Sequence, residues 1–298
     1  MKHEKAPGMS RTIAVGCYLS GVVSEKLPLS ESTIAVIGAG NMGQAILRGL
    51  VSTQAVEPSR IWVTTRRPEG ARKLASEWGV RAASSNAEAV AAADAIVMAV
   101  KPQIFHGVIE EVKVDLRSKL TISVAAGVST GRIEAWVGGP ARVVRAMPNT
   151  PASIGEGATA LCRGARSTAA DLALAEALFQ SVGRTAVVDE EHLDAVTGLS
   201  GSGPAYVFLM IEAFADAGVK VGLSREIAQS LATQTIKGSA QLLLETGEHP
   251  GRLKDRVTSP GGTAIAGLHV LEAGGLRTTI MDAVEAAARR AKELGDRD

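Results

Sequence analysis

Apolar runs of strand length alternate with helix-length stretches from Thr33 to about residue 190. The runs read TIAVIG, RIWVTT, DAIVMAV, TISVAAG and ARVVRAM, and the stretches between them include residues 42–51 and 72–78. Strands that are apolar almost throughout and are separated by helices are typical of a parallel sheet covered on both faces. GATALC and TAVVDE flank a further predicted helix over 169–182, and we expect both runs to extend the sheet at its edge.

After about His192 the strand pattern ends and long helices are predicted. They cover residues 204–217, 225–245, 263–272 and 277–294, with a turn at His249 and Pro250. The stretch 206–215 reads YVFLMIEAFA and is apolar on nearly every face, Glu212 being the exception. A helix that is apolar all round is expected to be buried. Because a small helical domain offers little interior, this helix indicates contact with a partner subunit.

The composition narrows the class of protein. The chain's 298 residues allow two domains with a sizeable core. Its 32 lysines and arginines nearly balance 31 acidic residues and only 3% of residues are aromatic, which argues against nucleic acid or an anionic membrane as partner. The cysteines, Cys17 and Cys162, and the histidines have no metal-ligand spacing. We expect a cytoplasmic protein without disulfides or bound metal.

The N-terminal segment 12–23, TIAVGCYLSGVV, partly resembles a secretory signal. Glu4, Tyr18 and Ser20 interrupt that pattern, and no small-residue cleavage site follows it. No stretch of the sequence reaches the roughly 20 apolar residues that a membrane span needs. We interpret residues 1–30 as a disordered extension outside the folded domains.

A glycine-rich turn, GAGNMG, follows the first strand and opens the first helix. Gly38, Gly40 and Gly43 have the G-x-G-x-x-G spacing of dinucleotide-binding sites, in which the glycines permit a tight turn, close approach of a pyrophosphate, and packing of helix on strand. Free N–H groups at the helix N-terminus then face the phosphates. We therefore predict an α/β fold: an N-terminal Rossmann-type, doubly wound, mostly parallel sheet over 31–190, followed by an all-helical C-terminal dimerisation domain over 191–298.

The end of the second strand distinguishes between the two common dinucleotides. NAD sites usually have an acidic residue about 20 residues beyond the glycines. Here that place holds Thr64, Thr65, Arg66 and Arg67, and the next acidic residue is Glu69. Hydroxyl and guanidinium groups suit a 2′-phosphate, so we predict NADPH as the cofactor, with NADH as a poorer substitute. The alternative is that both arginines are simply solvated.

Two further motifs are candidates for chemistry. MAVKPQ ends a strand with Lys101 at the sheet edge where ligands bind in such folds, which makes this lysine a candidate for the cofactor crevice. A lysine that only caps the strand in solvent would fit the spacing equally well. GLSGSGPAY, residues 198–206, fails the G-x-S-x-G pattern of serine hydrolases and follows no strand, which excludes that class.

Near the C-terminus, SPGGTAIAG places a serine and two glycines before a predicted helix. Because glycine is a poor helix former, Gly261 and Gly262 indicate that something approaches the backbone there. The N–H groups near Gly262 and Thr263, with the hydroxyl of Ser259, would bind a carboxylate at the helix N-terminus. An ordinary capped turn would need only the serine. We therefore predict a carboxylate site that positions the substrate, and assign the helical domain to substrate binding as well as dimerisation.

Several motifs, in this order and spacing, closely resemble those of the pyrroline-5-carboxylate reductases. They are GAGNMG, AVKPQ, RAMPNTP, GLSGSGPAY and HPGRLKDRVTSPGGT, and the resemblance runs over residues 33–294. Members of that family reduce 1-pyrroline-5-carboxylate to L-proline with NAD(P)H, the last step of proline biosynthesis. The resemblance implies a Rossmann domain, a helical dimerisation domain, a homodimer at least, and a further assembly of dimers in many members.

The resemblance also implies roles for individual residues. The pyrophosphate would lie on Gly38, Ala39, Gly40, Asn41, Met42 and Gly43. The adenosine half would contact Thr65, Arg66, Arg67 and Asn86, and the nicotinamide side would contact Ala99, Val100, Lys101 and Pro102. The substrate carboxylate would rest on Ser259, Gly262 and Thr263 of the partner subunit. Met147, Asn149 and the turn 201–204 would line the rest of the pocket.

One position departs from the family pattern. Members commonly carry a threonine two places after the second glycine, but this chain has Ala264 there and a threonine only at Thr263. Either Thr263 substitutes, or no side-chain proton donor is needed, because an imine that enters protonated is already a good hydride acceptor. We predict a mechanism based on positioning, with hydride passing from the nicotinamide to C5 of the ring. A six-membered cyclic imine is a further candidate substrate, since one methylene discriminates weakly.

Two rival interpretations were weighed. The β-hydroxyacid dehydrogenases share this two-domain plan, but Val207 and Ile211 stand where their catalytic lysine and asparagine belong, which excludes them. A non-catalytic NADPH-binding regulator would keep the glycine loop and the arginines, yet it would have no use for a carboxylate site. Measured turnover separates the regulator from the reductase.

Overall fold

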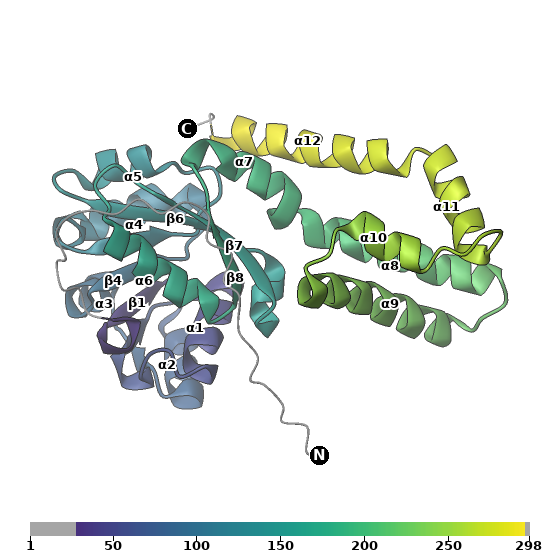
Figure 1. The fold of residues 1–298 in the computed structure, drawn as a ribbon. Coiled ribbons are helices and arrows are strands. Elements are labelled where there is room, and N and C mark those ends of the chain that lie inside the picture. Colours follow the sequence, from purple (N-terminus) through teal and green to yellow (C-terminus); the bar gives the residue numbers. More distant parts are fainter. Residues whose placement is uncertain (1–27, 296–298) are drawn as a thin grey trace, which may run out of the picture.

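The structure, a computed structural model, describes residues 28–295 and contains one eight-stranded sheet within that range (Figure 1). The segment 12–23 and most of the predicted extension 1–30 lie outside the described residues. The strand order is β3-β2-β1-β4-β5-β6-β7-β8, and only the β6–β7 pair is antiparallel. The strands are β1 (Ile34–Ile37), β2 (Ile61–Val63), β3 (Arg81–Ala82), β4 (Ala95–Met98), β5 (Leu120–Ser123), β6 (Arg142–Met147), β7 (Gly157–Arg163) and β8 (Gly183–Val187).

Helices cover both faces of this sheet, because its central strands are apolar on both sides. One core lies between the sheet and α1 (Asn41–Ser52), α2 (Pro68–Trp78) and α6 (Ala169–Gln180). A second core lies between the opposite face and α3 (Asn86–Ala92), α4 (Pro102–Leu116) and α5 (Thr130–Val137). Short 3₁₀ turns complete this part of the chain: η1 (Leu29–Glu31), η2 (Pro58–Arg60), η3 (Thr150–Ile154) and η4 (Glu190–His192). The predicted doubly wound, mostly parallel α/β fold is confirmed.

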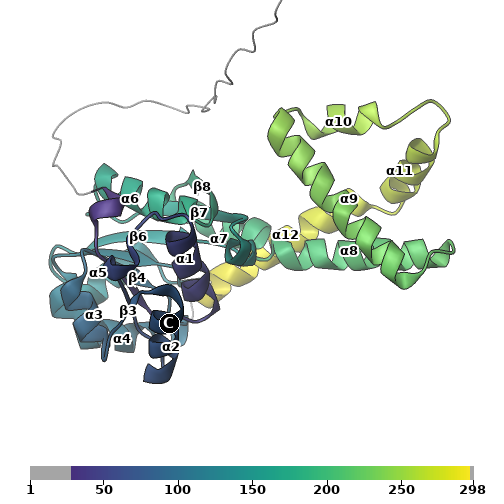
Figure 2. The ribbon, with the colours of Figure 1, turned by 90° about the horizontal axis from the view of Figure 1, so that it is seen from below.

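The rest of the described chain is helical. It comprises α7 (Leu193–Val196), a π-helical turn η5 (Thr197–Gly201), α8 (Gly203–Lys220), α9 (Arg225–Thr246), α10 (Pro250–Arg256), α11 (Thr263–Ala273) and α12 (Leu276–Gly295). Figures 1 and 2 show α8 to α11 reaching away from the sheet, while α12 runs back to pack on α7 and η5. The predicted turn at His249 and Pro250 is in fact the start of α10, where His249 Nδ1 accepts a hydrogen bond from Gly251 N at 3.1 Å.

The apolar helix predicted over 206–215 forms α8, but it is not buried within one chain. Phe208 is 65% exposed and Leu209 is 66% exposed. The buried residues of α8 and α9 in the described structure are Ala215, Ala228 and Ala232. α9 therefore covers only a narrow strip of small residues on α8, and the large side chains have no cover in their own chain. The predicted burial of this helix is therefore not achieved within one chain, and burial against a partner subunit stays a prediction.

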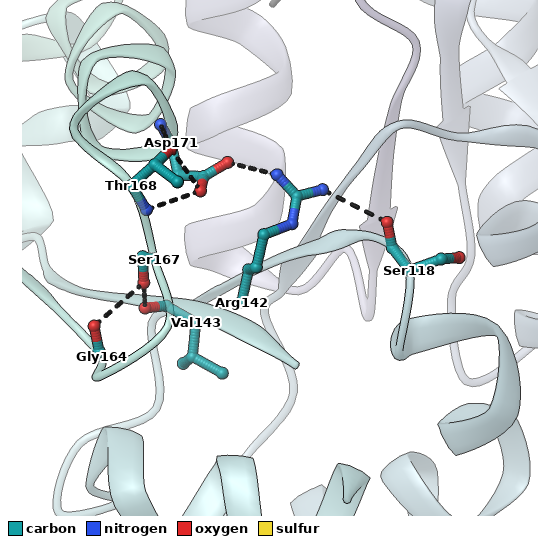
Figure 3. Close-up of polar contacts among 7 residues, drawn as sticks. All are labelled: Ser118, Arg142, Val143, Gly164, Ser167, Thr168 and Asp171. Carbon is teal, nitrogen blue, oxygen red and sulfur yellow. Dashed lines mark hydrogen bonds and ion pairs between the residues drawn. The ribbon is translucent and has the colours of Figure 1, made fainter. Parts of the chain in front are cut away.

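A polar cluster fastens α6 to the amino end of β6 (Figure 3). Arg142 Nη1 lies 2.6 Å from Asp171 Oδ1, and its Nη2 donates to Ser118 O at 3.2 Å. The other carboxylate oxygen of Asp171 accepts hydrogen bonds from the N–H and the hydroxyl of Thr168, both at 2.8 Å. These bonds satisfy a carboxylate that is almost fully buried. The cluster lies at the edge of the sheet opposite the carboxyl ends of the parallel strands, so its role is structural.

Candidate cofactor and substrate sites

The three glycines of the first loop have different surroundings, which match the roles predicted for them. Gly38 has φ +82°, and a Cβ there would collide with Val100 Cγ1. A Cβ on Gly43 would lie 3.1 Å from Gly38 O and 3.4 Å from Ala99 Cβ, so α1 packs close to the strands. Gly40 is open: the nearest atom to its Cβ position is 4.0 Å away. The first and third glycines are thus required by the fold, and the second leaves room for a ligand.

The N-terminus of α1 has unpaired donors. Its N-cap is Gly40, which offers no side chain, and the first N–H bonded to a backbone acceptor in this turn is that of Gln44, 2.8 Å from Gly40 O. The N–H groups of Asn41, Met42 and Gly43 are the free donors of the first helical turn. Together with the helix dipole and the open space at Gly40, they fit a pyrophosphate.

Thr64, for which the sequence predicted no structural role, links the glycine loop to Asn86. Gly38 N donates to Thr64 Oγ1 at 3.2 Å, and Thr64 Oγ1 donates to Asn86 Oδ1 at 2.8 Å. Asn86 Nδ2 in turn donates to Glu111 Oε2 at 3.0 Å. Thr64 is buried, so this chain of hydrogen bonds holds the loop and the first residue of α3 in fixed relation. In the sequence, the one sign of this chain of hydrogen bonds is a threonine at the end of a strand, and that signal is weak.

The basic residues after β2 lie at the surface. Arg66 and Arg67 are exposed, and among the described residues neither side chain has a hydrogen-bond or ion-pair partner. Thr65 is half-buried, and its hydroxyl donates to Arg67 O at 2.5 Å, which shapes the turn before α2. Two guanidinium groups without internal partners remain available to bind a phosphate.

The loop after β4 contacts the glycine loop. Ala99 N donates to Ile37 O at 2.9 Å, and Val100 packs against the Cα of Gly38. Lys101 is the N-cap of α4 and Pro102 is its first residue. The side chain of Lys101 is exposed and has no polar partner in the described part of the chain. Ala99 and Val100 thus pack against the glycine loop at Gly38, and Lys101 follows them at the exposed start of α4.

The segment GLSGSGP forms the π-helical turn η5 and the start of α8. Asn149 Nδ2 donates to Ser200 O at 3.3 Å and to Ser200 Oγ at 3.2 Å, and Asn149 Oδ1 accepts from Ala158 N at 2.9 Å. A Cβ on Gly201 would lie 2.8 Å from Met147 Cε. The structure therefore brings Met147 and Asn149 against this turn, at the carboxyl end of β6. Single π turns are frequent at functional sites.

The SPGG segment forms an open helix start. Gly261 has φ +66°, Gly262 is the N-cap of α11 without a side-chain cap, and Gly262 N donates to Ser259 O at 3.0 Å. A Cβ on Gly262 would collide with Ser259 Oγ, so the serine hydroxyl lies directly over this glycine. That hydroxyl has no hydrogen-bond partner within residues 28–295. With the N–H groups of the first turn of α11, it makes a site for a small anion.

These two sites are not together in one chain. Figures 1 and 2 both place α11 at the end of the helical part furthest from the sheet, whereas the glycine loop lies at the start of α1.

Within residues 28–295 no group of three or more histidine, cysteine or acidic side chains could hold a metal ion. Among the same residues no helix is long and apolar enough to cross a membrane.

Fold and site define a dinucleotide-dependent oxidoreductase with a separate helical domain. The comparisons with known proteins narrow this class. Residues 190–294 match the family model described as pyrroline-5-carboxylate reductase dimerisation. Residues 33–127 match the model described as NADP oxidoreductase, coenzyme F420-dependent. The chain is 46% identical to the pyrroline-5-carboxylate reductase of Arabidopsis thaliana, over 90% of this chain and 97% of the relative. It belongs to the pyrroline-5-carboxylate reductase family.

Other relatives agree. The chain is 42% identical to the Escherichia coli pyrroline-5-carboxylate reductase over 89% of its length and 98% of the relative. The solved structure of the Coxiella burnetii reductase is similar with a TM-score of 0.85 and 41% identity, covering 88% of this chain and 98% of that one. The Plasmodium falciparum enzyme, solved with NADP bound, has a TM-score of 0.78 and 35% identity, covering 90% of this chain and 100% of that one. The protein is thus an enzyme of proline biosynthesis, reducing 1-pyrroline-5-carboxylate to proline with NAD(P)H, and this favours the reductase over the non-catalytic regulator.

Proposed function

We propose that the sheet domain binds NADPH in the way its sequence predicts. The pyrophosphate lies on residues 38–43, and the 2′-phosphate lies near Thr65, Arg66 and Arg67. The open Cβ position of Gly40 beside free helix N–H groups is the observation that supports the first assignment. Two unpaired guanidinium groups support the second. Asn86 contacts the adenosine half, and Ala99, Val100, Lys101 and Pro102 border the nicotinamide.

The substrate carboxylate binds at the start of α11, on Ser259, Gly262 and Thr263. Because α11 lies far from the glycine loop of its own chain, the α11 that completes each site belongs to the partner subunit of a homodimer. The match of residues 190–294 to a dimerisation model supports that arrangement. The exposed apolar face of α8 supports it independently. Met147, Asn149 and the turn 201–204 line the remaining side of the pocket.

The residues of this chain catalyse the reaction mainly by positioning. NADPH held by the sheet domain would supply the hydride that adds to C5 of the substrate ring. The helix N-terminus of α11 holds the carboxylate, so the ring has one orientation, and the electron pair of the C=N bond moves onto the nitrogen. Ala264 offers no proton, and the nitrogen carries its proton from the start if the imine binds as an iminium. Orientation then supplies most of the rate acceleration.

Two substitutions test these assignments separately. Ser259→Ala removes a hydrogen bond to a charged carboxylate and is expected to raise KM for the imine about ten-fold or more, with KM for NADPH unchanged. Arg66→Glu places a negative charge beside the 2′-phosphate and is expected to raise KM for NADPH by a similar factor. The assay follows NADPH absorbance as 1-pyrroline-5-carboxylate is added. Ser239→Ala and Arg184→Glu, at exposed positions away from both sites, are the matched controls. Unchanged KM values would contradict the assignments.

Three further assignments are part of the proposal. The two domains meet near residue 190, and residues 191–298 provide both the dimer interface and the substrate carboxylate site. The dimers form a larger assembly, and the enzyme is cytoplasmic and also accepts NADH less well. A six-membered cyclic imine in the same assay tests how strictly the pocket selects ring size.

A further inference from the structure

Both ends of the helical part are attached to one short segment of the sheet domain. That segment is the loop after β5, residues 124–129, with the first turn of α5. One attachment is made by Glu190, in the turn η4 directly before the helical part, and the other is made by the last turn of α12. These two regions are about a hundred residues apart in sequence, and α12 also packs on α7 and η5.

Glu190 binds the N-terminus of α5. Its carboxylate accepts a hydrogen bond from Thr130 N at 2.7 Å and another from Thr130 Oγ1 at 2.5 Å. Arg145, on β6, lies 3.4 Å from the same carboxylate and is almost fully buried. Ser129 is the N-cap of α5 and binds Arg132 N, so the carboxylate of Glu190 satisfies a second free donor at this helix end.

The last residue of α12 packs on the same loop. Gly127 has φ +74°, and a Cβ on it would lie 3.3 Å from both the Cα and the nitrogen of Gly295, so the two backbones are in close contact. Arg132 Nη1 donates to Gly295 O at 3.1 Å, and its guanidinium also lies over the ring of Trp136, 5.7 Å from the centroid. A cation at the carboxyl end of a helix is stabilised by the helix dipole. Arg132 therefore holds α12 to the first turn of α5.

This segment borders the proposed nicotinamide side of the cofactor site. β5 is the neighbour of β4 in the sheet, and Val124 N donates to Met98 O at 3.2 Å, so the loop after β5 begins beside the loop that carries Ala99 and Val100. Both loops leave the carboxyl ends of their strands, where ligands bind in this type of sheet. A shift of the helical part would therefore move the loop after β5, which lies beside the proposed site of hydride transfer.

We propose that this contact is the joint that sets the orientation of the sheet domain relative to the helical dimer, with Glu190, Thr130 and Arg132 as positioning residues. The proposal rests on the division of the site between cofactor on the sheet domain and substrate on α11. Hydride transfer requires the cofactor and the substrate to be positioned relative to each other with a precision of a fraction of an ångström. NADPH binding requires the sheet domain alone. Loosening the joint should lower kcat and leave NADPH affinity as it was.

The test uses the full-length dimer with Thr130→Val, Arg132→Ala and Arg132→Lys. Thr130→Val keeps the shape and the Arg145–Glu190 pair and removes only the hydroxyl bond, so folding should persist. We expect Thr130→Val and Arg132→Ala each to lower kcat about ten-fold, with the NADPH dissociation constant, measured by fluorescence, within about two-fold of wild type. Arg132→Lys, which can still donate to Gly295 O, should recover most of kcat. Glu191→Ala, at the exposed residue beside Glu190, is the matched control and should behave as wild type.

Two results would overturn the joint. One is an unchanged kcat in Thr130→Val and Arg132→Ala. The other is a fall in kcat that is accompanied by an equal loss of NADPH affinity or of dimer, which would mean general destabilisation. Ser259→Ala, measured alongside, separates this failure from failure of the proposed site: a raised KM for the imine with wild-type kcat in the joint variants would refute the joint alone.

Discussion

The sheet domain and the helical part bury their apolar side chains to very different degrees. In the sheet domain the large residues of the core are fully buried, Phe105 and Phe179 among them. In α8 and α9 the buried residues are three alanines, and the large apolar residues lie outside: Phe208, Leu209, Phe214, Ile227, Leu231 and Leu242. A hollow of about 870 Å³ between the two helices is lined in part by Phe208 and Leu209.

This difference indicates that the sheet domain has a complete hydrophobic core of its own, whereas the helical part does not. The sheet domain contains both halves of its own core, on the two faces of the sheet. The helical part has one half of a core, and an exposed apolar surface of this kind marks a protein–protein interface. Family membership supplies the partner, which is a second copy of the chain. Under the proposed division of the site, the substrate site is complete only in the dimer.

The largest effect is expected from a charge in the exposed apolar face. Phe208→Asp places a carboxylate in the exposed apolar face of each subunit, where it must lose its water when the dimer forms. We expect a monomer by light scattering and a loss of turnover of about 100-fold or more. Val114→Asp, at a 70% exposed apolar position on the sheet domain, is the control and should stay dimeric and active. A Phe208→Asp protein of wild-type mass would remove the proposed contrast between the two parts.

A smaller effect is expected from breaking one ion pair in each part. Arg142→Ala leaves the buried carboxylate of Asp171 without its cation and should lower the free energy of unfolding by about 3 kcal/mol. Arg225→Ala breaks the pair with Asp216, whose side chains are more than half exposed, and should cost less than about 1 kcal/mol. Urea unfolding at one fixed protein concentration measures both. Equal effects would show that the two parts are not differently packed.

The smallest effect concerns pH and a thiol in the sheet domain. Burial, with the charge of Glu190 nearby, raises the pKa of Cys162 from its ordinary value of 9.0 to about 11. The folded protein therefore keeps this proton between pH 9 and 11, where the unfolded chain loses it. The stability that the buried thiol contributes is present below pH 9 and is lost as the pH rises through about 11. The difference in urea midpoint between wild type and Cys162→Ala should shrink from pH 8 to pH 10.5. A difference in urea midpoint that stays constant from pH 8 to pH 10.5 would contradict the raised pKa of Cys162.

The sequence predicted the sheet and its ligand loops well, because their signals are local. The continuous apolar runs identified the strands of the sheet except β3, which has two residues, Arg81 and Ala82, and no apolar run. The sequence of the polar helix α10 predicts only a turn, since it has no apolar face and begins with a proline. The positions of Gly38, Gly40 and Gly43 follow from sterics, which a motif encodes directly.

What the sequence could not show depends on contacts between distant residues. Thr64 looks like any strand-end threonine until the fold brings Asn86 within 2.8 Å of its hydroxyl. Glu190 contacts Thr130 because the fold brings η4 against the start of α5, and Gly295 contacts Arg132 because α12 returns to the sheet domain. The separation of α11 from the glycine loop is likewise a property of the whole fold. A local sequence pattern does not predict the distance in space between two motifs of the folded chain.

In the proposed dimer, each active site combines the glycine loop of one subunit with the α11 start of its partner. The most direct measurement is the activity of dimers from co-expressed Gly40→Asp and Thr263→Asp chains. The first substitution fills the open position of the cofactor loop, and the second repels the substrate carboxylate at a helix position that tolerates an acid. Each variant alone should be inactive. If sites form between subunits, half of the mixed population carries one intact site, and activity returns to about a quarter of wild type. If the mixture stays as inactive as its parents, each site lies within a single chain and the account is wrong.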